Sequence, residues 1–212
     1  MTSEPARKQT VAFFDGQNLF HAARSAFGYP FPNYDPKALA HAICARQGWM
    51  LKQTRFYTGI HTLAAKPAWN HFWTAKLAVM AREGIHVFSR PLRYRNYVVP
   101  LPDGTTYSYL AGEEKGVDAR IAVDVIGMAF RQEYDVALIF SQDQDLSEAA
   151  REIRVIAREQ GRWIKIACAF PVSPTYPNTR GINSTDWIPI ERGAYQACLD
   201  HRDYRPKGGG NP

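Results

Sequence analysis

The segments Val11-Ala-Phe-Phe-Asp-Gly-Gln-Asn18 and Val136-Ala-Leu-Ile-Phe-Ser-Gln-Asp-Gln-Asp145 decide the fold of this chain. Each is a short continuous apolar run that ends in acidic and amide residues. Such runs are typical of strands buried on both faces of a parallel sheet. Helix-like segments alternate with apolar runs along most of the chain, so we predict an α/β fold with a doubly wound, mainly parallel sheet between two helical layers.

Working outward from these runs, we predict strands at 11–14, 49–58, 85–89, 136–140, 163–170 and 187–190. We predict helices at 18–27, 36–47, 67–82, 117–132, 146–160 and 193–201. Residues 91–110 interrupt this alternation. There Pro102-Asp103-Gly104 separates two apolar stretches, which predicts a β-hairpin insertion.

The expected organisation is one domain at residues 10–203, preceded by an N-terminal arm at 1–9. Residues 171–203 would extend the domain, and 204–212 would form a flexible tail. The 212 residues are 45% hydrophobic and 22% charged, which excludes disordered and fibrous classes.

The three cysteines, Cys44, Cys168 and Cys198, are far apart and form no CxxC pair. This argues against a disulfide framework or a zinc ribbon and favours a reducing compartment. No apolar run reaches the length of about 18 residues that a membrane span needs. The N-terminus lacks the apolar core of a signal peptide, so we expect a cytoplasmic protein with no membrane partner.

The net charge of +6 is unevenly distributed. Residues 36–102 contain ten basic residues and one acid, whereas the remainder contains 16 basic and 19 acidic residues. This asymmetry favours a polyanionic partner, with nucleic acid as the first candidate. The segment from Phe88 to Tyr97 interleaves arginines with aromatic residues. We predict nucleic-acid contacts from Arg90, Arg93, Tyr94, Arg95 and Lys115. The alternative is a strand with its aromatic face in the core and its arginines in solvent.

Acidic residues follow two of the predicted strands, because Asp15 ends the first and Asp143 follows the fourth. The carboxyl ends of parallel strands share one edge of a sheet, so these side chains would meet, and Asp118 would join them from the start of a helix. Converging carboxylates stay ionised together only when a cation compensates them, and oxygen ligands favour Mg²⁺ or Mn²⁺. Each acid alone is equally explained as a turn residue or a helix cap. Asp124 lies about 240° round the helix from Asp118.

Three stretches together resemble the NYN domain family, a branch of the PIN-like metal-dependent ribonuclease superfamily. They are Val11 to Leu19, Glu114 to Asp124 and Tyr134 to Leu146, and the resemblance covers roughly residues 10–170. It implies a PIN-like sandwich whose acidic pocket binds Mg²⁺ or Mn²⁺ and cuts RNA. By position, the metal ligands would be Asp15, Asp118 and Asp143, and the further catalytic positions would be Asn18, Asp124, Ser141 and Asp145.

The chain departs from the family pattern after the last of these strands. The usual motif is Ser-Gly-Asp-Ser-Asp-Phe, but Gln142, Gln144 and Leu146 replace the glycine, the second serine and the phenylalanine. Losing the glycine restricts the backbone and would narrow the approach to the metal. The runner-up interpretation is therefore a non-catalytic RNA-binding module that retains the PIN-like fold.

Two other classes fit poorly. A phosphatase of the haloacid-dehalogenase type needs a second aspartate two residues after the first, where this chain has Gln17. A nucleotide-binding protein would carry GxxxxGK[ST] or GxGxxG, and neither occurs. His21 and His61 are expected to be ordinary surface or hydrogen-bonded histidines. Trp69, Phe72 and Trp73 would belong to the core or to the face of a homodimer.

Overall fold

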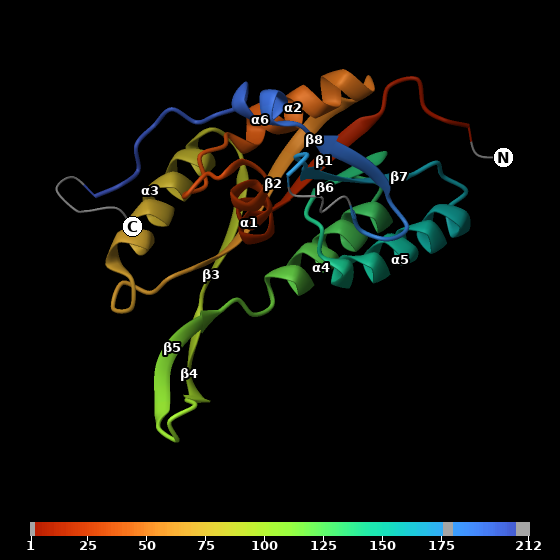
Figure 1. Cartoon of the computed structure of the whole chain (residues 1–212). Helices are drawn as coiled ribbons and strands as arrows, with labels where there is room; N and C mark the ends of the chain where they lie inside the picture. The colour runs from red at the N-terminus through yellow and green to blue at the C-terminus, as the bar shows by residue number, and fades with distance from the viewer. Residues whose placement is uncertain (1–2, 176–179, 207–212) are drawn as a thin grey trace.

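The computed structural model describes residues 3–175 and 180–206, and its centre is a six-stranded sheet with the order β3-β2-β1-β6-β7-β8 (Figure 1). The strands are β1 (Gln9–Asp15), β2 (Met50–Ile60), β3 (His86–Pro91), β6 (Val136–Phe140), β7 (Lys165–Pro171) and β8 (Asp186–Ile190). Every neighbouring pair in this sheet is parallel. The expected doubly wound α/β architecture is therefore confirmed.

Helices cover both faces of the sheet (Figure 1). One face packs against α1 (Gly16–Phe27), α2 (Pro36–Gln47), α3 (Pro67–Arg82) and α6 (Arg192–Gln196), and the other against α4 (Val117–Phe130) and α5 (Ser147–Glu159). The period of two along β1 produces this division, because successive side chains point to opposite faces. Ala12 and Phe14 enter the first core, and Val11 and Phe13 enter the second.

The hairpin insertion is also confirmed. Strands β4 (Arg93–Pro100) and β5 (Thr106–Glu113) form a separate antiparallel pair. Figure 1 shows this pair extending away from the layers of the sandwich. β4 begins two residues after the predicted start at 91, whereas β5 ends at Glu113, three residues beyond the predicted end at 110, and α4 begins at Val117.

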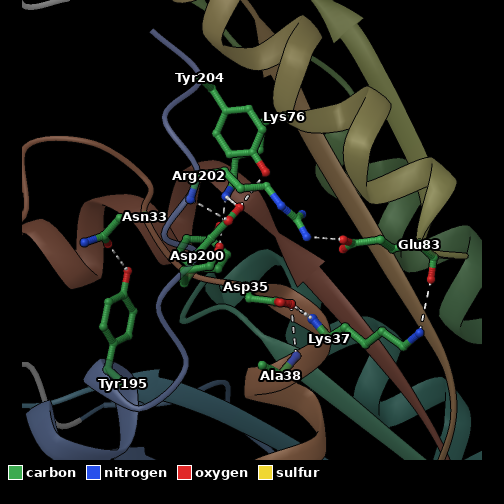
Figure 2. Close-up of polar contacts among 11 residues, drawn as sticks. Asn33, Asp35, Lys37, Ala38, Lys76, Glu83, Tyr195, Asp200, Arg202 and Tyr204 are labelled. Atoms are coloured by element: carbon green, nitrogen blue, oxygen red, sulfur yellow. Dashed lines mark hydrogen bonds and ion pairs between the residues drawn. The ribbon is translucent and has the colours of Figure 1, made fainter.

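The last helix, α6, is shorter than predicted: it ends at Gln196, whereas the prediction extended to residue 201. The following segment is held on the core instead. The buried Lys76 ammonium of α3 donates to Asp200 Oδ2 at 2.9 Å and to the Tyr34 carbonyl at 3.0 Å. Tyr204 donates to the same Asp200 oxygen at 2.7 Å (Figure 2). Of the predicted tail, residues 207–212 lie outside the described part of the chain.

Two further expectations can be compared with the structure. Cys44, Cys168 and Cys198 are buried and free. Phe72 and Trp73 are 2% and 1% exposed, so they belong to the core as expected.

Within the described residues, none of the helices combines the length and the apolar character that a bilayer crossing requires.

Candidate active site at the carboxyl edge of the sheet

The strand order places a topological switch point between β1 and β6, since the chain winds outward from them in opposite directions. These two strands pair in register, with Phe14 opposite Phe140. The two phenylalanine rings stack with their centroids 3.8 Å apart. The next residues, Asp15 and Ser141, therefore leave the sheet side by side at the edge where ligands of such folds bind.

Asp15 is only 2% exposed, although it carries a carboxylate. It caps α1, with Oδ1 accepting from the Asn18 backbone N–H at 3.0 Å, and Oδ2 accepts from Ser141 Oγ at 3.1 Å. Burial raises the pKa of Asp15 to about 7, and the negative charges of Glu114 and Asp118 add to the rise. The protein thus holds an acid whose ionised form is opposed by its surroundings.

The loop after β6 is built around Asp15 and the first turn of α1. Ser141 Oγ accepts from the Asp143 backbone N–H at 3.1 Å while it donates to Asp15. The Asn18 side-chain oxygen accepts from the Gln142 N–H at 2.9 Å. Asp143 Oδ1 then caps a 3₁₀ turn at Gln144–Leu146 by accepting from the Asp145 N–H, and no side chain of the described residues caps α5, so the alternative in which Asp145 is only a helix cap is wrong. Asp145 itself is exposed.

Two further acids approach from the start of α4. Asp118 lies in the first turn of this helix, after Gly116, whose φ of 75° favours glycine. Partial burial raises the pKa of Asp118, with Asp143 and Asp145 contributing. Burial also raises the pKa of Glu114 to about 7, and the negative charge of Asp118 adds to the rise. We call Asp15, Glu114, Asp118, Asp143 and Asp145 the acid cluster.

Glu114 was missed as a site residue, although it belongs to one of the stretches that carry the family resemblance. Its carboxylate accepts from the Gly59 backbone N–H at the end of β2. A Cβ atom on residue 59 would overlap Glu114, so glycine permits this approach. The only sequence signal was an acid four residues before Asp118, separated from it by a glycine turn.

The acid cluster differs electrostatically from the predicted site residue Asp124. Within residues 3–175 and 180–206, none of the five cluster acids forms an ion pair with lysine or arginine. Asp124 instead accepts from Arg55 at 2.9 Å and Tyr57 at 2.8 Å, and pairs with Arg120 at 3.0 Å. Burial opposes its charge, but these bonds hold the pKa of Asp124 below its ordinary value. The structure does not bring Asp124 into the cluster.

The two glutamines that depart from the family pattern hold the segment after residue 179. Gln142 Nε2 donates to the Arg180 carbonyl at 2.9 Å. Gln144 Nε2 donates to the Gly181 carbonyl at 2.9 Å, and its Oε1 accepts from the Asn183 N–H at 3.2 Å. The replaced motif residues therefore fasten the C-terminal extension to the rim of the site.

The predicted RNA-binding residues gather at the base of the hairpin. Arg93 and Arg95 share one face of β4, and Arg95 pairs with Glu113 at 3.6 Å while remaining 63% exposed. Lys115 also reaches Glu113, at 3.5 Å. Tyr94 points to the opposite face, where its hydroxyl bonds His61 Nδ1 at 2.7 Å. Arg90, at the end of β3, lies over the Phe88 ring at 5.2 Å.

The acid cluster has the donor chemistry of a hard divalent cation, since every side chain in it offers carboxylate oxygens. The side chains would still have to close around an ion. Among the described residues, no group of three His, Cys, Asp or Glu already forms a metal-holding arrangement.

The protein is a doubly wound α/β sandwich with a cluster of acids at its topological switch point. Comparison with known families identifies which family of such proteins it belongs to. The NYN domain model matches residues 9–171, so the chain belongs to the NYN domain family, which lies in the PIN-like ribonuclease superfamily. The family points to a nuclease or RNA-related function and is typically dependent on divalent metals. No curated protein matches the chain.

Among solved structures, a Vibrio parahaemolyticus protein of unknown function, VPA0982, is similar in fold. It has a TM-score of 0.53 at 18% identity, and the match covers 90% of this chain and 98% of that one. Ribokinase from Giardia lamblia is less similar, with a TM-score of 0.37 at 9% identity over 82% of this chain and 53% of its own.

Proposed function

We propose that this protein is a divalent-metal-dependent endoribonuclease that hydrolyses RNA at the acid cluster. The observation that carries the proposal is the set of five acids at the switch point, which have no lysine or arginine partner in the described residues. Maintaining such a set costs stability, because burial and neighbouring acids oppose the ionised forms of Asp15, Glu114 and Asp118. A bound divalent cation would offset this unfavourable charge and would supply the chemistry that cleaves a phosphodiester bond.

Asp15, Asp118 and Asp143 are the proposed ligands of Mg²⁺ or Mn²⁺. Such an ion lowers the pKa of water and polarises a phosphate oxygen. The chain's own contribution is positioning: Ser141 orients Asp15, and Asn18 fixes the loop that carries Asp143. In this proposal, the exposed Asp145 accepts a proton from the attacking water. Hydrolysis in this manner leaves a 5′-phosphate and a 3′-hydroxyl.

The proposed path for the RNA runs over the hairpin face that bears Arg93 and Arg95. Register places Tyr97, Tyr107 and Tyr109 on this same face. The rings of Tyr97 and Tyr109 stack at 5.6 Å, and all three tyrosines are more than one-third exposed. Exposed aromatic rings beside cations are suited to unpaired bases and phosphates. Arg90 and Lys115 would continue the positive surface toward the acid cluster.

The second candidate function is a non-catalytic RNA-binding module with the same fold. The bonds of Gln142 and Gln144 to the 180–183 segment favour it, because they bring additional chain to the rim of the site. Cleavage assays separate the two functions, since a pure binding module retains RNA but leaves it intact.

The test is cleavage of total RNA with Mg²⁺, Mn²⁺ or EDTA. We expect cleavage that EDTA abolishes, and a loss of at least about 100-fold in Asp15→Asn and Asp118→Asn. Glu159→Gln is the matched control, because Glu159 is an exposed acid at the last residue of α5, at the opposite end of that helix from the loop that carries Asp143 and Asp145. Full activity in Asp15→Asn would eliminate the proposal. RNA binding without cleavage in the wild type would select the module.

A further inference from the structure

A pocket of about 340 Å³ lies next to the acid cluster and shares Glu114 with it. Its lining comes from α1, the 61–66 loop, α3 and the base of the hairpin. The residues are Gln17, Phe20, His21, Arg24, His61, Lys66, Trp69, Trp73, Leu92, Gly112 and Glu114. Its volume falls in the range of small-molecule sites, which hold roughly 300–1,000 Å³.

One face of α1 supplies a polar side of this pocket. Gln17, His21 and Arg24 recur at helical spacing, so they project from the same side of the helix. Lys66 adds a second cation from the loop before α3. Neither Arg24 nor Lys66 has an ion pair or side-chain hydrogen bond within residues 3–175 and 180–206. The pocket therefore presents to an anionic ligand two cations that have no ion-pair partner in the described residues, with the Glu114 carboxylate at its edge toward the acid cluster.

Aromatic rings form another side. Trp69 is partly exposed and lies 6.1 Å from the Phe20 ring and 5.6 Å from the Phe72 ring, so its position is fixed by packing. Trp73 is buried beneath it, one helical turn further along α3. A partly exposed tryptophan supported in this way offers a flat apolar surface to a nucleobase.

Glu114 connects the pocket to the proposed cleavage site, because it belongs both to the pocket lining and to the acid cluster. Its bond to the Gly59 N–H holds it at the boundary. A ligand in the pocket would therefore adjoin a phosphate placed over Asp15 and Asp118.

We propose that this pocket binds one unpaired nucleotide of the RNA strand, adjacent to the phosphate that is cut. Arg24 and Lys66 contact the phosphate of that nucleotide, and its base lies against Trp69. The position of this pocket relative to a cleaved bond rests on the proposed ribonuclease function, whereas nucleotide binding itself does not. The pocket thereby selects single-stranded over duplex RNA, because a paired base cannot enter it.

The first experiment is titration calorimetry of the whole chain with adenosine and uridine 5′-monophosphates, adenosine, and inorganic phosphate. We expect saturable binding of both nucleotides that is at least tenfold tighter than that of adenosine or phosphate. Arg24→Gln combined with Lys66→Gln is expected to weaken nucleotide binding at least tenfold, and Trp69→Leu at least threefold. Arg131→Gln is the control, because Arg131 follows the far end of α4 and pairs with Glu133.

Unchanged nucleotide affinity in the Arg24 and Lys66 double variant, or no saturable binding, would overturn the pocket. Phosphate binding as tight as nucleotide binding would overturn the role of Trp69. The Asp118→Asn variant separates this proposal from the ribonuclease function, since it should bind nucleotide normally. On a short single-stranded RNA, the pocket variants should raise KM at least fivefold and change kcat less than threefold. A loss of kcat alone would contradict the proposed role.

Discussion

Asp15 shows at the scale of one residue how function and stability oppose each other. Its carboxylate is almost completely buried, and its pKa is raised to about 7 by burial and by acidic neighbours. The folded protein therefore holds the Asp15 proton more tightly than the unfolded chain does. The contribution of Asp15 to stability therefore falls as pH rises from about 4 to about 7, because the carboxyl of the unfolded state ionises first.

This sign leads to a prediction for Asp15→Asn. The amide is uncharged at every pH, and it retains an acceptor for the Asn18 N–H. Without added metal, we expect the variant to be more stable than the wild type at pH 8, by up to about 4 kcal/mol, because each pKa unit between about 4 and about 7 corresponds to about 1.4 kcal/mol. The difference should shrink toward zero at pH 4. Urea unfolding of both proteins at pH 4 and pH 8 measures this difference in free energy of unfolding. A stabilisation of the variant that is no larger at pH 8 than at pH 4 would contradict the raised pKa of Asp15.

Gln144 illustrates a residue that replaces a family feature with a structural one. Its side chain bonds the Gln142 and Gly181 carbonyls and the Asn183 N–H, and so joins two distant segments. We expect Gln144→Ala to lower the free energy of unfolding by about 1–2 kcal/mol, through the lost hydrogen bonds. Amide exchange should accelerate in the 180–185 region. RNA cleavage should persist, because Gln144 contributes no carboxylate. Unchanged exchange there would show that the glutamine does not hold the segment.

At the scale of elements, the hairpin combines a structural base with an open face. Tyr94 bonds His61 at the base, whereas Tyr97, Tyr107 and Tyr109 form an exposed row beyond it. Large apolar side chains are normally withdrawn from solvent, so an exposed aromatic row on a projecting element indicates contact with a partner. The adjacent arginines make RNA the partner that we propose.

The salt dependence of RNA binding tests this face. Each phosphate contact to single-stranded nucleic acid contributes about 0.7 to the slope of log affinity against log salt. Arg93→Ala should reduce the slope by about that amount. Arg95→Ala should reduce it less, because Glu113 already compensates Arg95. Arg131→Ala, at the far end of α4, should leave the slope unchanged. Equal slopes for all three variants would exclude the hairpin as the RNA path.

At the scale of the whole molecule, the C-terminal segment closes the core over α3. Lys76 is fully buried and bonds Asp200, while Arg202 pairs with Glu83 at the end of the same helix (Figure 2). The Tyr204 ring lies 4.9 Å from the Lys76 ammonium. A buried ammonium requires such partners, so Lys76 is one anchor of this segment, together with the Arg202–Glu83 pair.

Removing that charge should destabilise the whole fold. Lys76→Ala leaves the Asp200 carboxylate without its cation, so we expect a loss of about 3–5 kcal/mol. The double variant Lys76→Met and Asp200→Leu removes both charges and should be clearly more stable than Lys76→Ala. Chemical unfolding of the two variants compares them. A cost below about 1 kcal/mol for Lys76→Ala would show that the ion pair does not anchor the segment.

Local pattern by itself determined the strands, most helices and the hairpin of this protein. The apolar run before Asp15 predicts a doubly buried strand, and Asp35-Pro36 predicts the helix start that α2 shows. Such features depend on neighbours a few residues apart, so they can be read along the chain. Strand-end acids were also predictable, since parallel strands share one carboxyl edge.

Only the tertiary structure decided which acids meet. Glu114 reaches the cluster through Gly59, 55 residues away, and Asp124 is withdrawn from it by Arg55, 69 residues away. The partners of Gln144 and Lys76 were likewise not predictable from the sequence. Gln144 bonds Gly181 and Asn183, and Lys76 bonds Asp200, which is 124 residues away. A side chain's partner across such distances depends on strand order and on the space left by other residues. These are properties of the assembled core, which no local spacing encodes.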